Sequence, residues 1–396
     1  MQINNPPIAP SNLYPPDGSS GITINPTLLW SCTDPDPGDT LRYDVYFDTL
    51  NPPLTRVSTN QGDTTLPRSG LSPNTTYYWK VVAKDNHGDT TAGSVWRFTT
   101  RIPWVVQTSP IPAFLCEVHF PVDAQTGYIV GGGGTILKTT DGGANWVQQN
   151  SGTTNTLESV HFPTDNQTGY VVGSGGKILK TINGGSVWDT LSSGATLPLH
   201  SVYFPLNTQT GYIVGENYLI LKTTDGGANW VQQFLGTTNT LGSVHFPVDD
   251  RTGYAVGGYG IMFRTSNGGS SWDTTSSFTT FDLGSVYFPA DVQTGYVVGS
   301  TGTILKTING GSSWATQNSG VFANLLSIHF PQNAQTGYAV GDTGRVLKTV
   351  DGGVNWVTQI SGVSAMLTSV YFPLDSQTGY AVGSGGMILK TTSGGE

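Results

Sequence analysis

The sequence is organised around a Gly-Tyr pair that recurs seven times, each time 42 residues further along the chain. The tyrosines of the pair are Tyr128, Tyr170, Tyr212, Tyr254, Tyr296, Tyr338 and Tyr380. Around each pair the same longer phrase returns: roughly Leu-x-Ser-Val-His/Tyr-Phe-Pro, Gln-Thr-Gly-Tyr-x-Val-Gly, Ile-Leu-Lys-Thr and Asp/Asn-Gly-Gly-x-x-Trp. A period of about 40 residues with several short strand signals per unit is typical of a β-propeller.

One copy, residues 157–190, predicts four antiparallel strands. Residues 159–162 form a short strand that ends at a proline, and residues 168–173 and 177–181 form two more. An Asn-Gly-Gly turn then leads into a fourth strand around Trp188. Each copy therefore predicts one four-stranded blade.

The ends of the repeat region predict how the ring closes. Seven periods fill residues 103–396, but the last copy stops before its tryptophan, whereas Trp104 lies one period before Trp146. We therefore expect residues 104–107 to form the outer strand of a seventh blade whose inner three strands come from the C-terminus. Such closure removes the unpaired sheet edges. The predicted fold is all-β, with a seven-bladed propeller over residues 101–396.

Residues 1–100 predict a separate β-sandwich. Alternating apolar runs are separated by Pro, Gly, Asn and Asp clusters. With Trp30 in an early strand and a tyrosine-corner-like stretch at residues 70–79, this part resembles a fibronectin type III domain, a module that serves as a spacer or adhesion unit. Cys32 and Cys116 fall in different predicted domains. Two free thiols are favoured over an inter-domain disulfide.

One loop of the first domain is a candidate calcium site. Asp34, Asp36 and Asp39 place three carboxylates within six residues, and Ca²⁺ prefers oxygen ligands. The alternative is a solvated loop that its two prolines hold extended. No other cofactor is expected.

The Asp/Asn-Gly-Gly-x-x-Trp turn resembles the Asp-box of sialidases and related propellers. The resemblance implies a structural turn, distant from any chemistry, in which the Asp or Asn bonds backbone amides of its own turn. The full repeat over residues 102–396 more closely resembles the photosystem II stability and assembly factor family and its bacterial relatives. Because propellers host many unrelated activities, that resemblance predicts fold rather than function.

Composition excludes some classes of function. A net charge of −9 argues against a nucleic-acid-binding surface. The sequence contains no run of 18 apolar residues, so no membrane span is predicted. Low charge with abundant Gly, Thr, Ser and Asn suits extracellular or cell-surface proteins. The N-terminus lacks the features of a signal peptide, so we expect an exported protein to be present here in a mature form.

The seven copies differ from one another mainly on one face. The fourth-to-first and second-to-third connections vary, whereas the turns on the opposite face barely change. A ligand site breaks the symmetry of a repeat, although loop drift also produces variation. The candidate binding residues on this varying face are Phe114, Glu158, His200, Tyr218, Tyr259, Asp282, Asn324 and Met366.

Two positions keep their chemistry in every copy. One is His119, His161, Tyr203, His245, Tyr287, His329 and Tyr371, for which we expect packing between blades rather than a metal site. The other is Lys138, Lys180, Lys222, Arg264, Lys306, Lys348 and Lys390, which we expect to pair with carboxylates or to cover aromatic rings.

The favoured function is a non-catalytic extracellular protein whose varying face contacts a glycan or a protein partner. The alternatives are a self-associating subunit of a surface array or filament, a glycoside hydrolase, and an assembly factor like the photosystem II family. A hydrolase needs two facing carboxylates, and the varying face offers Glu158, Asp282, Glu216 and Asp342.

Overall fold

The computed structural model describes residues 4–234 and 239–396 and divides the chain into two compact units. One unit is Met1–Pro103 together with Glu396, and the other is Trp104–Gly395. All regular elements in the described residues are strands or single 3-10 turns. Within those residues, no helix is both long and apolar enough to cross a bilayer.

The N-terminal unit contains two sheets that share one hydrophobic core. Trp30 and Trp79 are fully buried between them, and Tyr77 Oη accepts the Ser72 N–H at 3.0 Å. One sheet has the order β1-β3-β6, and the other β2-β9-β7-β4-β5, with β8 also paired to β7. The strands are β1 (Ser11–Tyr14), β2 (Ser19–Ile22), β3 (Thr27–Ser31), β4 (Arg42–Asp48), β5 (Arg56–Gln61), β6 (Thr65–Pro67), β7 (Thr76–Lys84), β8 (Thr90–Ala92) and β9 (Trp96–Thr100).

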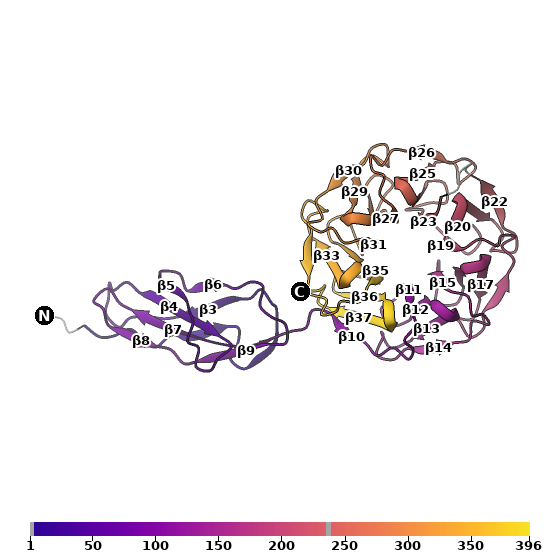
Figure 1. The fold of residues 1–396 in the computed structure, drawn as a ribbon. Coiled ribbons are helices and arrows are strands. Elements are labelled where there is room, and N and C mark those ends of the chain that lie inside the picture. The colour runs from indigo at the N-terminus through magenta and orange to yellow at the C-terminus, as the bar shows by residue number, and fades with distance from the viewer. Residues whose placement is uncertain (1–3, 235–238) are drawn as a thin grey trace. The chain divides into compact units, whose positions relative to one another are not determined.

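The second unit consists of seven four-stranded antiparallel sheets arranged in a ring (Figure 1). Six of the sheets are continuous in sequence. They are β11 (Leu115–His119) to β14 (Val147–Gln149) with β12 (Gly127–Gly131) and β13 (Thr135–Thr139); β15 (Leu157–His161), β16 (Gly169–Gly173), β17 (Lys177–Thr181) and β18 (Asp189–Leu191); β19 (Leu199–Tyr203), β20 (Gly211–Gly215), β21 (Leu219–Thr223) and β22 (Val231–Phe234); β23 (Leu241–His245), β24 (Gly253–Gly257), β25 (Met262–Thr265) and β26 (Asp273–Thr275); β27 (Leu283–Tyr287), β28 (Gly295–Gly299), β29 (Ile304–Thr307) and β30 (Ala315–Gln317); and β31 (Leu325–His329), β32 (Gly337–Gly341), β33 (Arg345–Thr349) and β34 (Val357–Gln359).

A 3-10 turn joins the second and third strands of each of the seven sheets in the ring. These turns are η1 (Gly132–Gly134), η2 (Ser174–Gly176), η3 (Glu216–Tyr218), η4 (Gly258–Gly260), η5 (Ser300–Gly302), η6 (Asp342–Gly344) and η7 (Ser384–Gly386). The middle residue of each turn has a positive φ, for example 67° at Gly133 and 57° at Tyr259.

The seventh sheet joins the two ends of the propeller segment. Its order is β10 (Val105–Val106), β37 (Met387–Thr392), β36 (Thr378–Gly383) and β35 (Leu367–Tyr371). Val105 pairs with Lys390, and Trp104 is buried edge-on against Phe372, with ring centroids 6.0 Å apart. The pairing expected for residues 104–107 is therefore confirmed for Val105 and Val106, and the Gln107 N–H also donates to the Ile388 carbonyl at 2.8 Å.

The recurring Gly-Tyr pair binds each sheet to the next. Tyr128 stacks on Phe162 of the following sheet at 4.1 Å and donates its hydroxyl to the carbonyl of Gly184 at 3.1 Å. Equivalent hydroxyl bonds of 2.8–3.2 Å occur at all seven tyrosines. The glycine is required because a Cβ at Gly127 would lie 2.4 Å from the Phe120 ring.

Candidate functional site

The two faces of the ring are built from different connections. On one face the turn of each Asp-box contacts the first-to-second connection, as in the bond from Gly142 N–H to the Gln125 carbonyl. On the other face the 3-10 turns contact the fourth-to-first connections, as in the bond from Ser174 N–H to the Thr156 carbonyl. This second face is the varying face of the sequence analysis.

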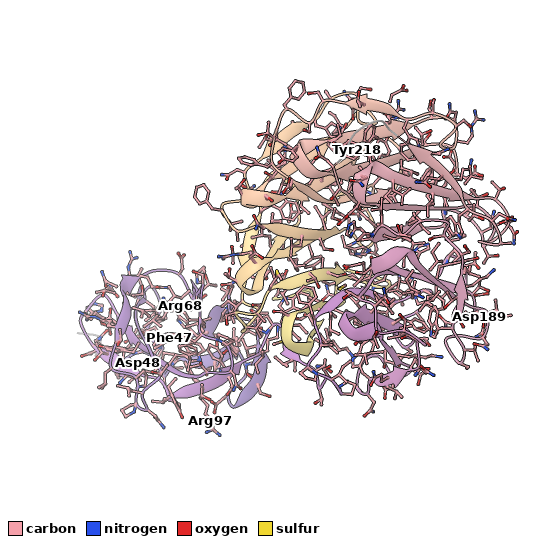
Figure 2. All side chains as sticks on the ribbon, turned by 45° about the vertical axis from the view of Figure 1, so that its right-hand side comes forward. Phe47, Asp48, Arg68, Arg97, Asp189 and Tyr218 are labelled. Atoms are coloured by element: carbon pink, nitrogen blue, oxygen red, sulfur yellow. The ribbon has the colours of Figure 1, made fainter. Side chains whose placement is uncertain are left out.

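The predicted binding residues have unequal access to solvent on that face. Tyr259 is 72% exposed and Phe114 is 41% exposed. Tyr218, which Figure 2 labels, is only 3% exposed and packs in the core edge-on to Phe263. Tyr218 therefore offers no surface to a ligand. The reason is its position: Tyr218 is the third residue of its 3-10 turn, and Tyr259 is the second residue of the next one.

Two of the remaining predicted residues form hydrogen bonds that stabilise turns of the fold. Asp282 Oδ1 accepts the Tyr259 N–H at 2.9 Å, and Asn324 Oδ1 accepts the Thr301 N–H at 3.0 Å, so both hold a 3-10 turn of the preceding sheet. His200, Glu158 and Met366 are half-buried. Their role as ligand contacts stays a prediction.

Two exposed phenylalanines on the connection that contacts the 3-10 turn of Tyr259 were not anticipated. Phe278 is 80% exposed and Phe281 is 48% exposed. Residues 275–281 and Gly260 line one hollow of about 560 Å³, and Tyr259 and Asp282 border a second of about 330 Å³. We call Tyr259, Phe278 and Phe281 the aromatic patch. Comparison of the copies could have found Phe278, because the equivalent residue is Gly152, Gly194, Gly236, Gly320 or Gly362 in five other copies.

Two members of the aromatic patch hold an unfavourable backbone conformation. Tyr259 and Phe278 both have φ of 57°. A non-glycine residue in this region costs roughly 1–2 kcal/mol, and neither side chain recovers that cost by burial. Strain of this kind concentrates at functional sites.

The conserved His/Tyr position forms a closed ring of seven aromatic side chains. Each ring contacts the rings of both neighbouring sheets, with centroids 4.6–5.1 Å apart around the whole circle. His119 Nε2–H donates to the Phe162 carbonyl at 3.3 Å, and His245 Nδ1 accepts the Phe288 N–H at 3.3 Å. Packing between sheets, as the sequence predicted, is confirmed.

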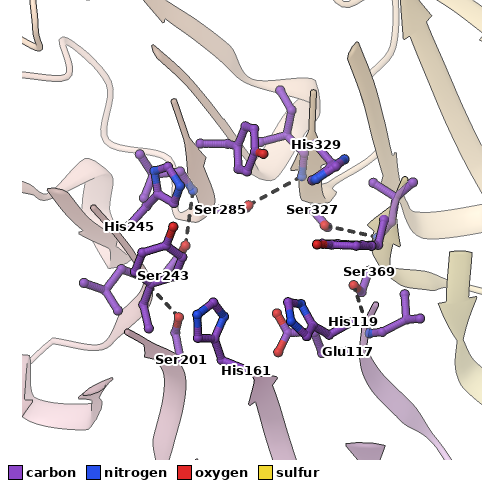
Figure 3. Close-up of a pocket in the computed structure, with 18 of the residues that line it drawn as sticks. Glu117, His119, His161, Ser201, Ser243, His245, Ser285, Ser327, His329 and Ser369 are labelled. Carbon is purple, nitrogen blue, oxygen red and sulfur yellow. Dashed lines mark hydrogen bonds between the residues drawn. The ribbon is translucent and has the colours of Figure 1, made fainter. Parts of the chain in front are cut away.

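Burial keeps these rings uncharged. It lowers the pKa of His119, His245 and His329 to about 3 and that of His161 to about 4, and it raises the pKa of Tyr203 to about 12. The ring therefore presents neutral imidazoles and phenols to a central channel of about 200 Å³ (Figure 3).

A second ring of hydrogen bonds surrounds the channel and contains one exception. In six sheets a serine hydroxyl accepts a backbone N–H of the next sheet at 3.1–3.4 Å; the serines are Ser159, Ser201, Ser243, Ser285, Ser327 and Ser369. In the remaining sheet the acceptor is Glu117, whose Oε2 accepts the Val160 N–H at 2.6 Å. Burial raises the pKa of Glu117 to about 7, although the Val160 bond opposes the shift. The sequence analysis missed this substitution of Glu for Ser.

The recurring Lys/Arg position of the repeat has a structural role. Lys138 Nζ donates to the Gly184 carbonyl of the next Asp-box at 2.7 Å and lies 5.6 Å from the centroid of the Tyr128 ring. The expected contact with an aromatic ring is confirmed at this lysine, but its hydrogen-bond partner is a carbonyl rather than a carboxylate. In the Asp-box, Asp141 Oδ1 accepts the Asn145 N–H at 2.9 Å, as expected.

Three carboxylates of the acidic loop in the N-terminal unit lie close to one another. One carboxylate oxygen from each of Asp34, Asp36 and Asp39 lies within 4.8 Å of the others. Asp36 also accepts the Asn5 N–H at 2.6 Å, and Asp34 accepts the Asp36 N–H at 2.9 Å. The calcium site stays a prediction. Cys32 and Cys116 carry free thiols.

Together, four-stranded sheets in a closed ring, Asp-box turns and sheet-to-sheet tyrosine bonds define a β-propeller of the BNR-repeat type. The family model described as photosynthesis system II assembly factor YCF48 matches residues 97–204, 149–236 and 199–277. Over residues 97–277 the chain therefore resembles the YCF48-like BNR-repeat propellers. No curated protein matches the chain.

Solved structures show the same fold at low sequence identity. YCF48 bound to a D1 peptide has a TM-score of 0.62 at 20% identity, over 74% of this chain and 95% of that one. YCF48 from Cyanidioschyzon merolae has a TM-score of 0.62 at 21% identity, over 73% and 98%. The GH74 enzyme of Niastella koreensis also reaches 0.62, at 15% identity, over 74% of this chain and 54% of the enzyme.

Proposed function

We propose that this protein is a non-catalytic factor that binds a polypeptide segment of a partner protein on the varying face of its propeller. The YCF48-like repeats support an assembly-factor role, and a YCF48 has been solved with a D1 peptide bound. The sequence analysis placed an extracellular glycan- or protein-binding function first. The comparisons fit its assembly-factor alternative better, and they support a protein partner rather than a glycan.

The aromatic patch is the observation that carries the proposal. Interfaces obtain most of their binding energy from a few residues, and tyrosine and tryptophan lead among them. Tyr259 and Phe278 expose large rings from strained positions where most other copies of the repeat have a small residue. A fold that needed only a turn would keep glycine at residue 278, so the phenylalanine points to selection for contact with a partner.

The hydrolase alternative lacks a comparable observation. Asp282 is engaged with the Tyr259 N–H, and Asp342 Oδ2 accepts Asn324 Nδ2 at 2.9 Å. Burial raises the pKa of the Cys116 thiol, and the charge of the nearby Glu158 raises it further. Asp282 and Asp342 therefore support turns, and the match to the GH74 enzyme is a likeness of fold.

The test is selection of peptides from a random display library on the full chain, followed by calorimetric titration of the selected peptides. The triple variant Tyr259→Gly, Phe278→Gly, Phe281→Asn returns each patch residue to one found at that position in another copy. Each lost aromatic anchor should weaken binding by roughly tenfold or more.

The matched control is the double variant Ile182→Thr, Ile308→Thr. It removes two side chains that are 68% and 72% exposed beside the Asp-box turns, and threonine occupies that position in other copies. If binding survives the patch variant but is lost in the control, the peptide site lies on the Asp-box face, and the proposal is wrong. Selected peptides that bind all variants equally would reject the proposal.

We infer that the seven sheets are the blades of a seven-bladed propeller and that the N-terminal unit is a fibronectin type III-like spacer. The tyrosine hydroxyl bond to Ser72 supports the latter. An extracellular location and self-association into arrays stay predictions. Light scattering over a range of concentrations tests self-association.

A further inference from the structure

The central channel contains one carboxylate that the architecture does not need. Six sheets make the same inter-sheet bond with serine, so a hydroxyl suffices for that role. Glu117 makes the bond with Oε2, and its side chain also lines the channel. Figure 3 shows its side chain beside His119 and near His161.

This carboxylate has no cationic partner among the side chains that line the channel. The lining residues are serines, valines, isoleucine, histidines and tyrosines, and burial keeps the histidines neutral. A half-buried carboxylate without a counter-ion is costly and either takes up a proton or recruits a cation. In its ionised form, Glu117 therefore makes the channel suited to a positively charged ligand.

The rest of the lining favours an organic ammonium. Faces of aromatic rings attract cations, and three tyrosines and four histidines surround the channel. His119 and His161 donate their Nε2–H to backbone carbonyls, so each neutral ring retains a lone pair on Nδ1. A primary ammonium has three N–H donors to share among a carboxylate, such nitrogens and the serine hydroxyls.

A transition metal is the less suitable occupant. Among the described residues, the groups of three His, Cys, Asp or Glu side chains close enough to share an ion all lie between residues 34 and 87. Glu117, His119 and His161 do not form such a group. A volume of about 200 Å³ accommodates a small amine together with water.

We propose that the central channel binds a primary ammonium group, held by the Glu117 carboxylate within the ring of histidines and tyrosines. The ammonium can belong to a free small amine or to a lysine side chain of a partner. This site is separate from the aromatic patch, and its test does not depend on the proposed function.

The test uses the full chain and saturation-transfer NMR with propylammonium, with 1-propanol as the uncharged analogue. Propylammonium should bind the wild type, and its affinity should fall by roughly tenfold or more in Glu117→Ser and in Glu117→Gln. Glu117→Ser installs the residue of the other six sheets and so preserves the inter-sheet bond. Circular dichroism checks that both variants fold.

The control is Asp189→Asn, which removes the same charge from the exposed outer strand β18 (Figure 2). It should leave propylammonium binding unchanged. A lysine-containing tripeptide compared with its norleucine analogue distinguishes a side-chain source from a free amine. Equal binding to wild type and Glu117→Ser, absence of binding to the wild type, or preferential binding of Zn²⁺ or K⁺ at Glu117 would overturn the proposal.

Discussion

The backbone N–H of Val160 donates to Glu117 Oε2 at 2.6 Å, at a position where six other sheets use a serine hydroxyl. One of the seven side chains that accept these inter-sheet hydrogen bonds is thus ionisable. Since the other six acceptors cannot ionise in the physiological range, the effect of Glu117 on stability can be separated from theirs by varying pH.

Glu117 should make the propeller less stable as pH rises. Its pKa is raised from 4.5 to about 7, so between these values the folded state holds a proton that the unfolded state has released. Stability therefore falls across this window, by at most about 3 kcal/mol. Relative to wild type, Glu117→Ser should gain stability from pH 4.5 to pH 7.5 in urea unfolding. Parallel pH curves for the two proteins would contradict this prediction, and Asp189→Asn provides the charge control.

Phe278→Gly should stabilise the protein while weakening partner binding. The substitution removes a positive-φ strain of about 1 kcal/mol, and the lost side chain is 80% exposed and contributes little packing. The midpoint of urea denaturation should rise. The matched variant Phe322→Thr removes a side chain that is 94% exposed and should not shift the midpoint. A fall in stability for Phe278→Gly would show that the ring packs on its own molecule.

Trp104→Ala should loosen the seventh sheet. The indole is 1% exposed and anchors β10 against Phe372, so its removal should cost about 3–5 kcal/mol. Deletion of residues 101–108 should cost more, because it also leaves β37 as an unpaired edge, and light scattering should detect aggregation. Val105→Thr, at a site that is 46% exposed, is the control. Unchanged melting of the deletion variant would refute ring closure by this segment.

Asp141→Asn should be tolerated, whereas Asp141→Ala should not. Asn183 accepts the Val187 N–H at 3.0 Å in the equivalent turn, so an amide oxygen can do the same task. Bonds from the Asn145 side chain and backbone lower the pKa of Asp141 to about 2. Its stabilisation is therefore present above an unfolded pKa of 3.8 and is lost as pH falls through about 2. Melting curves between pH 2 and 5 should show a weaker pH dependence for Asp141→Asn.

The periodic features of the sequence predicted most of the propeller. The 42-residue spacing predicted the strands, and the position of Trp104 predicted how the ends meet. Single exceptions to the repeat were harder to interpret. Tyr218 and Tyr259 were grouped together although they occupy successive positions of their turns, and a shift of one residue in a 3-10 turn separates a buried ring from an exposed one. Glu117 and Phe278 were visible in the sequence, but only the structure showed that one lines the channel and the other is exposed.

The pairing of β10 with β37 has a consequence for biosynthesis. During translation, a nascent chain that ends before Met387 can form six complete sheets. Val105 and Val106 then have no strand to pair with, so sheet edges stay unpaired. The circle can be completed only after the last repeat leaves the ribosome. Until then the unpaired sheet edges are open to pairing with another chain.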